Sequence, residues 1–264
     1  MSVAEIADDA TAPAAVAAVY TDIRAVTGAA VVNLVWRRLA AEDAATLERV
    51  WARLRGPYAS GRLDDLAAPL TPPMPKIALR PHLLASPETP RAVVAAYDAN
   101  NRRNLTAFSA LLGRGAESAP PARFTLPAEA ASAPVPTLPP LADLPANLHA
   151  RLHRLDRFAN ADGVGPLASL YRHLAPWPAL LEAAEEALAP LHASGVLAQL
   201  RDETLRRARA AAAQLPDLAL PPADRAVVEA VAGVLVDRTI PRMIPIGRLI
   251  GALIGLHIRE GAFS

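Results

Sequence analysis

Seven polar and charged side chains lie close together in the middle of a predicted helix over residues 90–112. Asparagine is a poor helix former, so three asparagines within five positions of one helix need a physical reason. One reason is a cavity toward which the helix directs its amide groups. The simpler alternative is a solvated helix face. The seven residues are Tyr97, Asp98, Asn100, Asn101, Arg102, Arg103 and Asn104.

The chain resembles itself at a spacing of 134 residues, with one further match shifted by a single position. Two such blocks in register predict a duplicated helical unit. We therefore expect an all-α fold of two tandem helical repeats, each of about 130 residues, packed as an intramolecular pseudo-dimer with any site between them. The matching segments are Ala-Ser-Gly at 59–61 and 193–195, Arg-Ala-Val-Val at 91–94 and 225–228, and Trp-Arg-Arg-Leu-Ala at 36–40 with Tyr-Arg-His-Leu-Ala at 171–175.

The repeat suggests what chemistry the polar cluster could do. Asn104 corresponds to Arg238, so the two side chains could face one cavity from opposite halves, and a planar guanidinium can bind a carboxylate through two parallel hydrogen bonds. Asp98 and Asp237 flank these positions and are candidate general bases. His173 is a third candidate, because an imidazole titrates near pH 6.5. Each has a simpler interpretation as a surface charge, an ion-pair partner or a hydrogen-bonding group at a helix end.

Apolar periodicity and the breaks between periodic segments define the elements that must position these residues. We expect the first repeat over residues 1–112, a linker rich in proline and alanine over 113–147, and the second repeat over 148–264. No stretch alternates apolar and polar residues for long enough to indicate a sheet. The predicted helices cover 14–27, 29–40, 44–54, 90–112, 148–158, 167–174, 179–191, 197–215 and 223–261, the last of them long or kinked.

Composition excludes several classes of function. The 264 residues include 27 basic and 26 acidic side chains, so the net charge of +1 gives no field that would attract nucleic acid or anionic lipid. The chain has no cysteine, which excludes disulfides and thiol chemistry and fits a cytoplasmic protein, and its first residues do not resemble a secretory signal.

We expect no metal, no cofactor and no membrane span. His149 and His153 are four residues apart, but no third ligand follows at a supporting spacing. Residues 240–258 are strongly apolar, yet they contain two arginines and two prolines and so favour a buried core helix over a lipid-facing one. A homodimer formed through this apolar segment is the remaining alternative.

Several short motifs, in their order and spacing, resemble the group I 2-haloacid dehalogenases. The resemblance covers nearly the whole chain and implies an all-helical fold of two repeats with the active site between them. It rests on Tyr-Thr-Asp-Ile-Arg at 20–24, Gly-Pro at 165–166 with Ala-Ser at 168–169, Trp-Pro at 177–178, Leu-Ala-Pro at 188–190 and Gly-Val-Leu at 233–235.

The resemblance also implies a reaction and the residues that would perform it. Enzymes of this family displace halide from a 2-haloalkanoic acid by direct attack of water that an aspartate deprotonates. The family's asparagine in the matching first-repeat helix corresponds to Asn101, whereas its aspartate, seven residues before Trp-Pro, corresponds to Leu170. Leucine cannot accept a proton, and general-base catalysis contributes roughly 10²- to 10⁴-fold in rate. The chain thus resembles a divergent member that lacks the catalytic aspartate.

Two functional hypotheses follow, and the sequence leaves both open. In the first, a hydrolase-like enzyme acts on a small carboxylic acid: Arg238 and Asn104 orient the carboxylate, Asn101 positions water, and Asp98, Asp237 or His173 is the base. In the second, the cavity around Leu170 binds a small ligand without catalysis. A third possibility, an interaction protein that uses its apolar C-terminal helix, has less support because the framework around Leu170 is retained.

Overall fold

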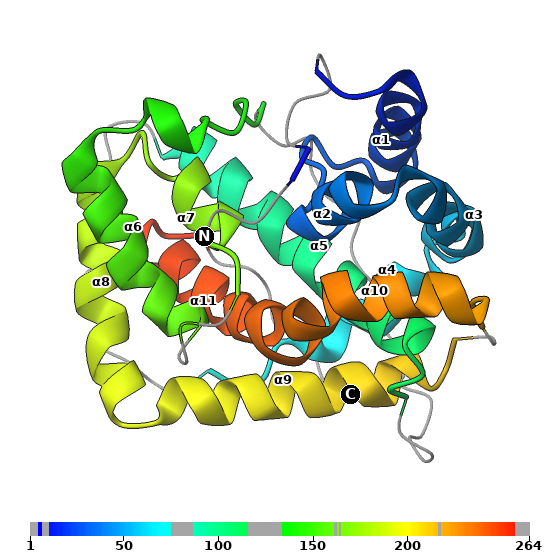
Figure 1. The fold of residues 1–264 in the computed structure, drawn as a ribbon. Helices are drawn as coiled ribbons and strands as arrows, with labels where there is room; N and C mark the ends of the chain where they lie inside the picture. The colour runs from blue at the N-terminus through cyan, green and yellow to red at the C-terminus, as the bar shows by residue number, and fades with distance from the viewer. Residues whose placement is uncertain are drawn as a thin grey trace.

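The computed structural model describes residues 5–6, 11–74, 87–115, 134–160, 163, 165–215 and 218–256, and this part of the chain contains helices and no strand (Figure 1). The predicted all-α fold is confirmed. The first half forms α1 (Ala14–Thr27), α2 (Leu34–Glu42), α3 (Ala44–Ala59), α4 (Arg62–Ala67), the 3-10 turn η1 (Ala68–Leu70) and α5 (Glu88–Leu111). The second half forms the 3-10 turn η2 (Leu141–Asp143), α6 (Ala146–Ala159), α7 (Ser169–His173), α8 (Pro178–Ala193), α9 (Val196–Ala212), α10 (Pro222–Val234), the π-helical turn η3 (Leu235–Thr239) and α11 (Ile240–Leu253).

Local sequence explains where the helices of the first half begin and end. The side chains of Asn33 and Asp43 accept hydrogen bonds from the first backbone N–H groups of α2 and α3, as N-cap residues do. Gly28 ends α1 with a left-handed backbone at φ 66°, which glycine adopts without steric cost. These caps fix the chain entering α2, where the candidate site begins.

Corresponding helices of the two halves are separated by a nearly constant number of residues. The first residues of α3 and α8, Ala44 and Pro178, differ by 134 in number, and so do the first residues of α5 and α10, Glu88 and Pro222. The turns that precede α4 and α9 also match. Each is a serine followed by a glycine, and Gly61 and Gly195 have φ of 72° and 78°. The observed element order therefore follows the sequence repeat.

The last part of each half differs. Where the first half has the single helix α5, the second has α10, η3 and α11 in series. The predicted final helix over 223–261 thus contains a π-helical turn, and its residues 257–261 lie outside the described part of the chain.

Two hydrophobic cores form, and each draws on both halves of the sequence. The first contains α1 to α4 and the end of α5, together with α10 and the end of α9. The second contains α6 to α8 and the start of α9, together with the beginning of α5 and most of α11. In Figure 1, α10 lies beside α2 and α3, whereas α11 lies among the helices of the second half. Helices α5 and α11 pack against each other where the two cores meet.

Candidate functional site

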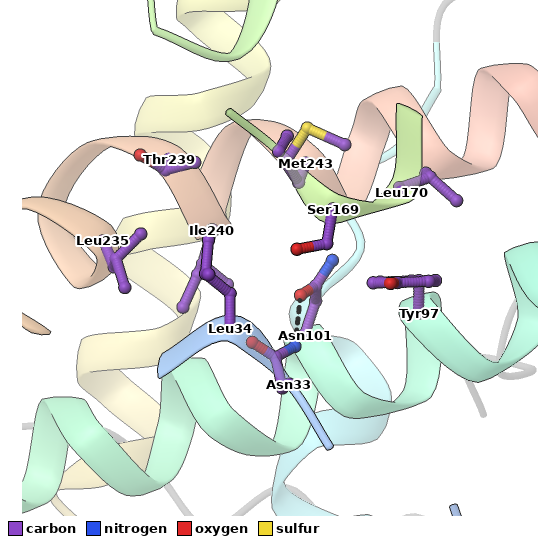
Figure 2. Close-up of a pocket in the computed structure, with 11 residues that line it drawn as sticks. Asn33, Leu34, Tyr97, Asn101, Ser169, Leu170, Leu235, Thr239, Ile240 and Met243 are labelled. Carbon is purple, nitrogen blue, oxygen red and sulfur yellow. Dashed lines mark hydrogen bonds between the residues drawn. The ribbon is translucent and has the colours of Figure 1, made fainter. Parts of the chain in front are cut away.

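A small cavity lies where the two cores meet, and both halves of the chain line it (Figure 2). Its volume is about 30 Å³. Because a water molecule needs roughly 10–15 Å³ of such space, the cavity has room for about two or three waters. The lining residues come from the start of α2, the middle of α5, the start of α7, and η3 with α11. They are Asn33, Leu34, Tyr97, Asn101, Ala168, Ser169, Leu170, Leu235, Thr239, Ile240 and Met243.

Asn33 and Asn101 form the polar floor of the cavity. The Asn33 side chain caps α2 through its oxygen, which accepts from the Val35 N–H at 3.3 Å. Its amide nitrogen donates to Asn101 Oδ1 at 3.0 Å. Since this bond uses the Asn101 oxygen, the Asn101 NH₂ group is directed the other way, toward Ser169 in Figure 2. The cavity therefore has an amide donor fixed by a helix cap.

The opposite wall is the first turn of α7. Ser169 Oγ accepts a hydrogen bond from the Arg37 guanidinium at 2.6 Å. Leu170 is 1% exposed and belongs to the second core. It packs over Gly247 of α11, where a Cβ atom would lie 3.8 Å from its side chain. The wall is thus a hydroxyl beside a buried leucine.

A buried polar network holds this wall in place. Asp156 accepts from the Ala168 N–H at 3.1 Å, and the Asn160 amide donates both to Asp156 and to the Pro166 carbonyl. The Asn160 oxygen in turn accepts from the Thr239 hydroxyl at 2.7 Å. Burial raises the pKa of Asp156, against the opposing effect of these hydrogen bonds. The network ties α7 to η3 and positions Thr239 at the cavity.

Tyr97 is the one titratable side chain that lines the cavity in the described part of the chain. Its hydroxyl lies 3.3 Å from His173 Nδ1, and His173 Nε2 lies 2.7 Å from the Pro136 carbonyl oxygen. A carbonyl can only accept, so Nε2 carries the proton and Nδ1 accepts from Tyr97. Burial raises the pKa of Tyr97 to about 12 and lowers the pKa of His173. Both groups are therefore neutral at pH 7.

Two of the residues proposed from sequence line the cavity, and a third lies next to it. Asn101 and Leu170 are lining residues, and His173 contacts the lining residue Tyr97. Asn104 lies instead in the first core. Its oxygen accepts from the Trp36 indole N–H at 2.9 Å and from the Tyr58 hydroxyl at 2.7 Å.

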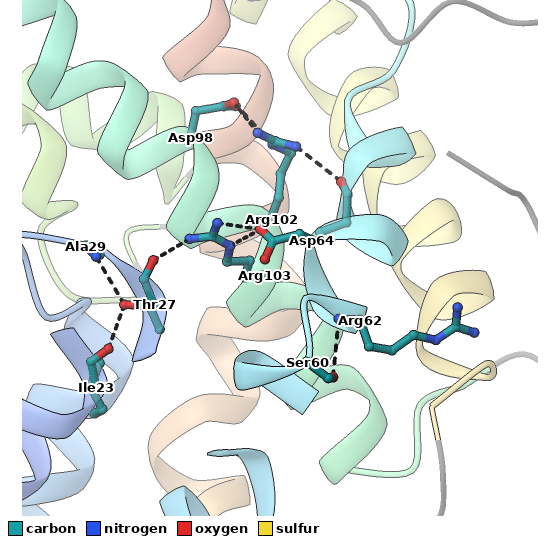
Figure 3. Close-up of polar contacts among 10 residues, drawn as sticks. Ile23, Thr27, Ala29, Ser60, Arg62, Asp64, Asp98, Arg102 and Arg103 are labelled. Atoms are coloured by element: carbon teal, nitrogen blue, oxygen red, sulfur yellow. Dashed lines mark hydrogen bonds and ion pairs between the residues drawn. The ribbon is translucent and has the colours of Figure 1, made fainter. Parts of the chain in front are cut away.

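The remaining charged candidates lie away from the cavity. Asp98 is buried but pairs with Arg102 at 2.9 Å and with Arg248 at 3.2 Å, so it joins α5 to α11. Figure 3 shows Arg102 beside Asp98 and next to Arg103, which pairs with Asp64. Arg102 also donates to the Ala67 carbonyl. Asp237 pairs with Arg114 at 2.8 Å. Arg238 is exposed and is not among the lining residues. The structure thus does not bring Asp98, Asp237 and Arg238 together with Asn101.

Sequence reasoning missed several polar residues that form or adjoin the site. Asn33 and Thr239 line the cavity, Arg37 donates to Ser169, and Glu5 pairs with Arg37. Asn33 could have been found as an N-cap before an apolar run. Arg37 could have been found from the shifted repeat, which aligns it with Arg172.

The described residues contain no group of three or more histidine, cysteine, aspartate or glutamate side chains that could hold a metal ion. None of their helices combines the length and the apolar character that crossing a membrane requires.

The fold is similar to that of solved D-2-haloacid dehalogenases. A D-2-haloacid dehalogenase mutant in complex with D-2-CPA matches with a TM-score of 0.70 and 16% identity over 96% of this chain and 97% of that chain. A second D-2-haloacid dehalogenase mutant gives a TM-score of 0.63 at 18% identity, and a D-2-haloacid dehalogenase in complex with L-LA gives 0.62 at 17%. Each of these covers 96% of this chain and 94% of the other.

No protein-family model and no curated protein sequence matches the chain. At these identities the structural similarity shows the fold, and the chain has a dehalogenase-like fold.

Proposed function

We propose that the protein binds a small carboxylic acid in the cavity and does not displace halide from it. The observation that carries this proposal is Leu170, which is 1% exposed and lines the cavity at the position that the family resemblance assigns to the water-activating aspartate. The lining residues in the described chain include no carboxylate and no imidazole. Loss of a general base costs roughly 10²- to 10⁴-fold in rate.

A carboxylic acid fits the polarity of the cavity. The Arg37 guanidinium lies behind Ser169, and α2 begins at the cavity with the positive end of its peptide dipoles. The Asn101 amide supplies a further donor. The dehalogenases of similar fold are, by name, enzymes of D-2-haloacids, which belong to the same ligand class. A three-carbon acid needs more room than two or three waters, so we expect the flexible side chain of Met243, which lines the cavity, to change rotamer when the acid binds.

Hydrolysis of a 2-substituted acid is the second candidate, and Tyr97 is the observation that favours it. Tyr97 lines the cavity, and its hydroxyl is hydrogen-bonded to His173 Nδ1. A proton could pass from water to Tyr97 as Tyr97 passes its own proton to His173. Burial opposes this, since it raises the pKa of Tyr97 to about 12 and lowers that of His173, so both charged forms are disfavoured. Binding without turnover is therefore the better-supported function.

The site's position between the halves rests on a related proposal. We infer that residues 1–112 and 148–264 are two copies of one unit arranged as a pseudo-dimer. The equal spacing of α3 with α8 and of α5 with α10 supports this, as do the matched glycine turns before α4 and α9. Corresponding elements line the cavity: the starts of α2 and α7, and the middle of α5 with η3.

Calorimetric titration with 2-chloropropanoate tests the binding proposal. We expect saturable binding to the wild-type protein, and an affinity at least about tenfold lower for Asn101→Leu, because a hydrogen bond to a charged group contributes roughly 1.5–3 kcal/mol. Asn100→Leu is the matched control: Asn100 is also buried on α5 but donates to the Val31 carbonyl and does not line the cavity. Equal affinities for the two variants, or no saturable binding, would rule the proposal out.

A further inference from the structure

Two arginines at corresponding positions of the repeat share a single carboxylate. Arg37 on α2 and Arg172 on α7 are aligned by the shifted repeat of residues 36–40 and 171–175. Arg37 Nη1 lies 3.1 Å from one oxygen of Glu5, and Arg172 Nη1 lies 2.8 Å from the other. The carboxyl group of Glu5 therefore lies between equivalent guanidinium groups of the two halves.

This cluster is buried and its hydrogen bonding is incomplete. The side chains of Arg37, Arg172 and Glu5 are 2%, 11% and 17% exposed. Within the described chain, Arg37 Nε and Nη1, Arg172 Nε and Glu5 Oε2 are buried without a hydrogen-bond partner. Two guanidinium groups facing one carboxylate leave an excess positive charge, and buried charge is costly unless it is paired. Arg37 Nη1 and Glu5 Oε2 still face each other as an ion pair at 3.1 Å, so the unused donors in the described chain are the Nε–H groups of Arg37 and Arg172.

The cluster adjoins the cavity through a single side chain. The Arg37 guanidinium contacts Glu5 through Nη1 and donates to Ser169 Oγ through Nη2 at 2.6 Å. Ser169 lines the cavity, as does Tyr97, whose pKa responds to Arg37, Arg172 and Glu5 after the larger effect of burial. A carboxylate bound by the two arginines would lie next to the cavity wall.

We propose that Arg37 and Arg172 form a binding site for the carboxylate of a small monocarboxylic acid, and that Glu5 occupies this site until the ligand displaces it. The choice of ligand rests on the function proposed above, whereas the site itself rests on the two arginines. The backbone beside Glu5 is anchored, because the Ile6 N–H donates to the Arg37 carbonyl and the Ile6 carbonyl accepts from the Tyr20 hydroxyl. Exchange therefore requires only that the partly exposed Glu5 side chain rotate toward solvent.

Internal competition of this kind lowers the apparent affinity for a ligand. A tethered carboxylate acts at a high effective concentration, and the apparent dissociation constant rises in inverse proportion to the fraction of sites that it leaves unoccupied. If Glu5 fills the site about nine-tenths of the time, its removal strengthens binding about tenfold. The wild-type protein would then respond only to a carboxylate present at high concentration.

Chemical rescue of Glu5→Ala by acetate is the test. We expect this variant to melt roughly 4–8 °C below the wild type, because two buried cations lose their partner. Sodium acetate should restore most of that difference when sodium chloride keeps the ionic strength constant, with a dissociation constant at least about tenfold lower than for the wild type. Glu186→Ala, an exposed glutamate on α8, is the matched control and should show no acetate effect.

Further variants identify the arginines as the cause. The double variant Glu5→Ala, Arg37→Met removes one cation together with the carboxylate, so it should fold but lose the response to acetate. Glu5→Gln retains the shape of the side chain, and it replaces Glu5→Ala in the acetate experiment if the alanine variant does not fold. In that variant too, acetate must stabilise more than chloride does.

The outcomes separate this inference from the proposed function. Equal stabilisation of Glu5→Ala and wild type by acetate, or an acetate response that survives Arg37→Met, overturns the inference while leaving Asn101-dependent binding of 2-chloropropanoate intact. Acetate rescue without any Asn101-dependent binding would instead establish the two-arginine site and reject the cavity ligand.

Discussion

Asn104→Leu is expected to cost roughly 2–5 kcal/mol of unfolding free energy. The Asn104 oxygen accepts from both the Trp36 indole N–H and the Tyr58 hydroxyl, and all three residues are buried. Each buried donor left without an acceptor costs about 1–3 kcal/mol. For a chain of this size the melting temperature should fall by roughly 5–15 °C. Urea and thermal unfolding, followed by circular dichroism, measure the change.

Tyr58→Phe is the control for this prediction. It removes one of the two donors together with its hydroxyl, so Asn104 retains the bond from Trp36 and the expected loss is only about 1 kcal/mol. Asn104 does not line the cavity, so folded Asn104→Leu should bind 2-chloropropanoate as the wild type does. A variant as stable as the wild type would contradict the predicted stabilising role of Asn104. A folded variant that has lost ligand binding would show that Asn104 contacts the ligand.

Separate expression of the two halves is expected to abolish folding altogether. A fragment of residues 1–115 lacks Val228, Val231 and Ile240, which belong to the first core, and a fragment of residues 134–264 lacks Val93 and Val94, which belong to the second. Each fragment would expose the apolar surface that is covered, in the whole protein, by helices from the other half of the chain. Neither alone should unfold cooperatively, whereas an equimolar mixture should regain helical circular dichroism and a single unfolding transition. Cooperative unfolding of residues 1–115 by themselves would contradict the two-core arrangement.

The local features of the fold could be predicted because they depend on neighbouring residues. Proline positions, glycine turns and apolar periodicity predicted the bounds of α1, whereas α2 begins at Leu34 rather than at residue 29, α3 continues to Ala59, and α4 was not predicted. Gly61 and Gly195 mark equivalent turns because each adopts a left-handed backbone. Which apolar face meets which partner is not encoded locally. The packing of α10 against the helices of the first half depends on tertiary contacts, so the sequence did not reveal it.

The site was predicted in part, and the misplacements follow from helix geometry. Asn101 and Leu235 correspond through the repeat, and both line the cavity. Asn104 and Arg238 lie three residues further on, which turns a side chain by about 60° from that direction. Arg238 is therefore exposed at η3, where Thr239 faces the cavity instead. The spacing alone therefore did not identify which face of each helix meets the cavity.

The sequence repeat shows the two arginines of the cluster, but it does not show the carboxylate that lies between them. Arg37 and Arg172 occupy equivalent places in two matching pentapeptides. Glu5, which contacts both, lies far from either in sequence and in no predicted helix. A buried ion pair between such distant residues becomes visible only once the chain is folded. The same holds for Asn33, whose contact with Asn101 spans 68 residues.

Chloride release from both enantiomers of 2-chloropropanoate, measured by ion chromatography beside calorimetric binding of the same acid, tests the central claim most directly. Since Leu170 supplies no base, the wild-type protein should bind the acid and release chloride no faster than a protein-free solution. Tyr97→Phe and Leu170→Asp should be assayed in parallel. Chloride release by the wild type that Tyr97→Phe abolishes would contradict the account, because it would show that Tyr97 and His173 together deprotonate water in the cavity.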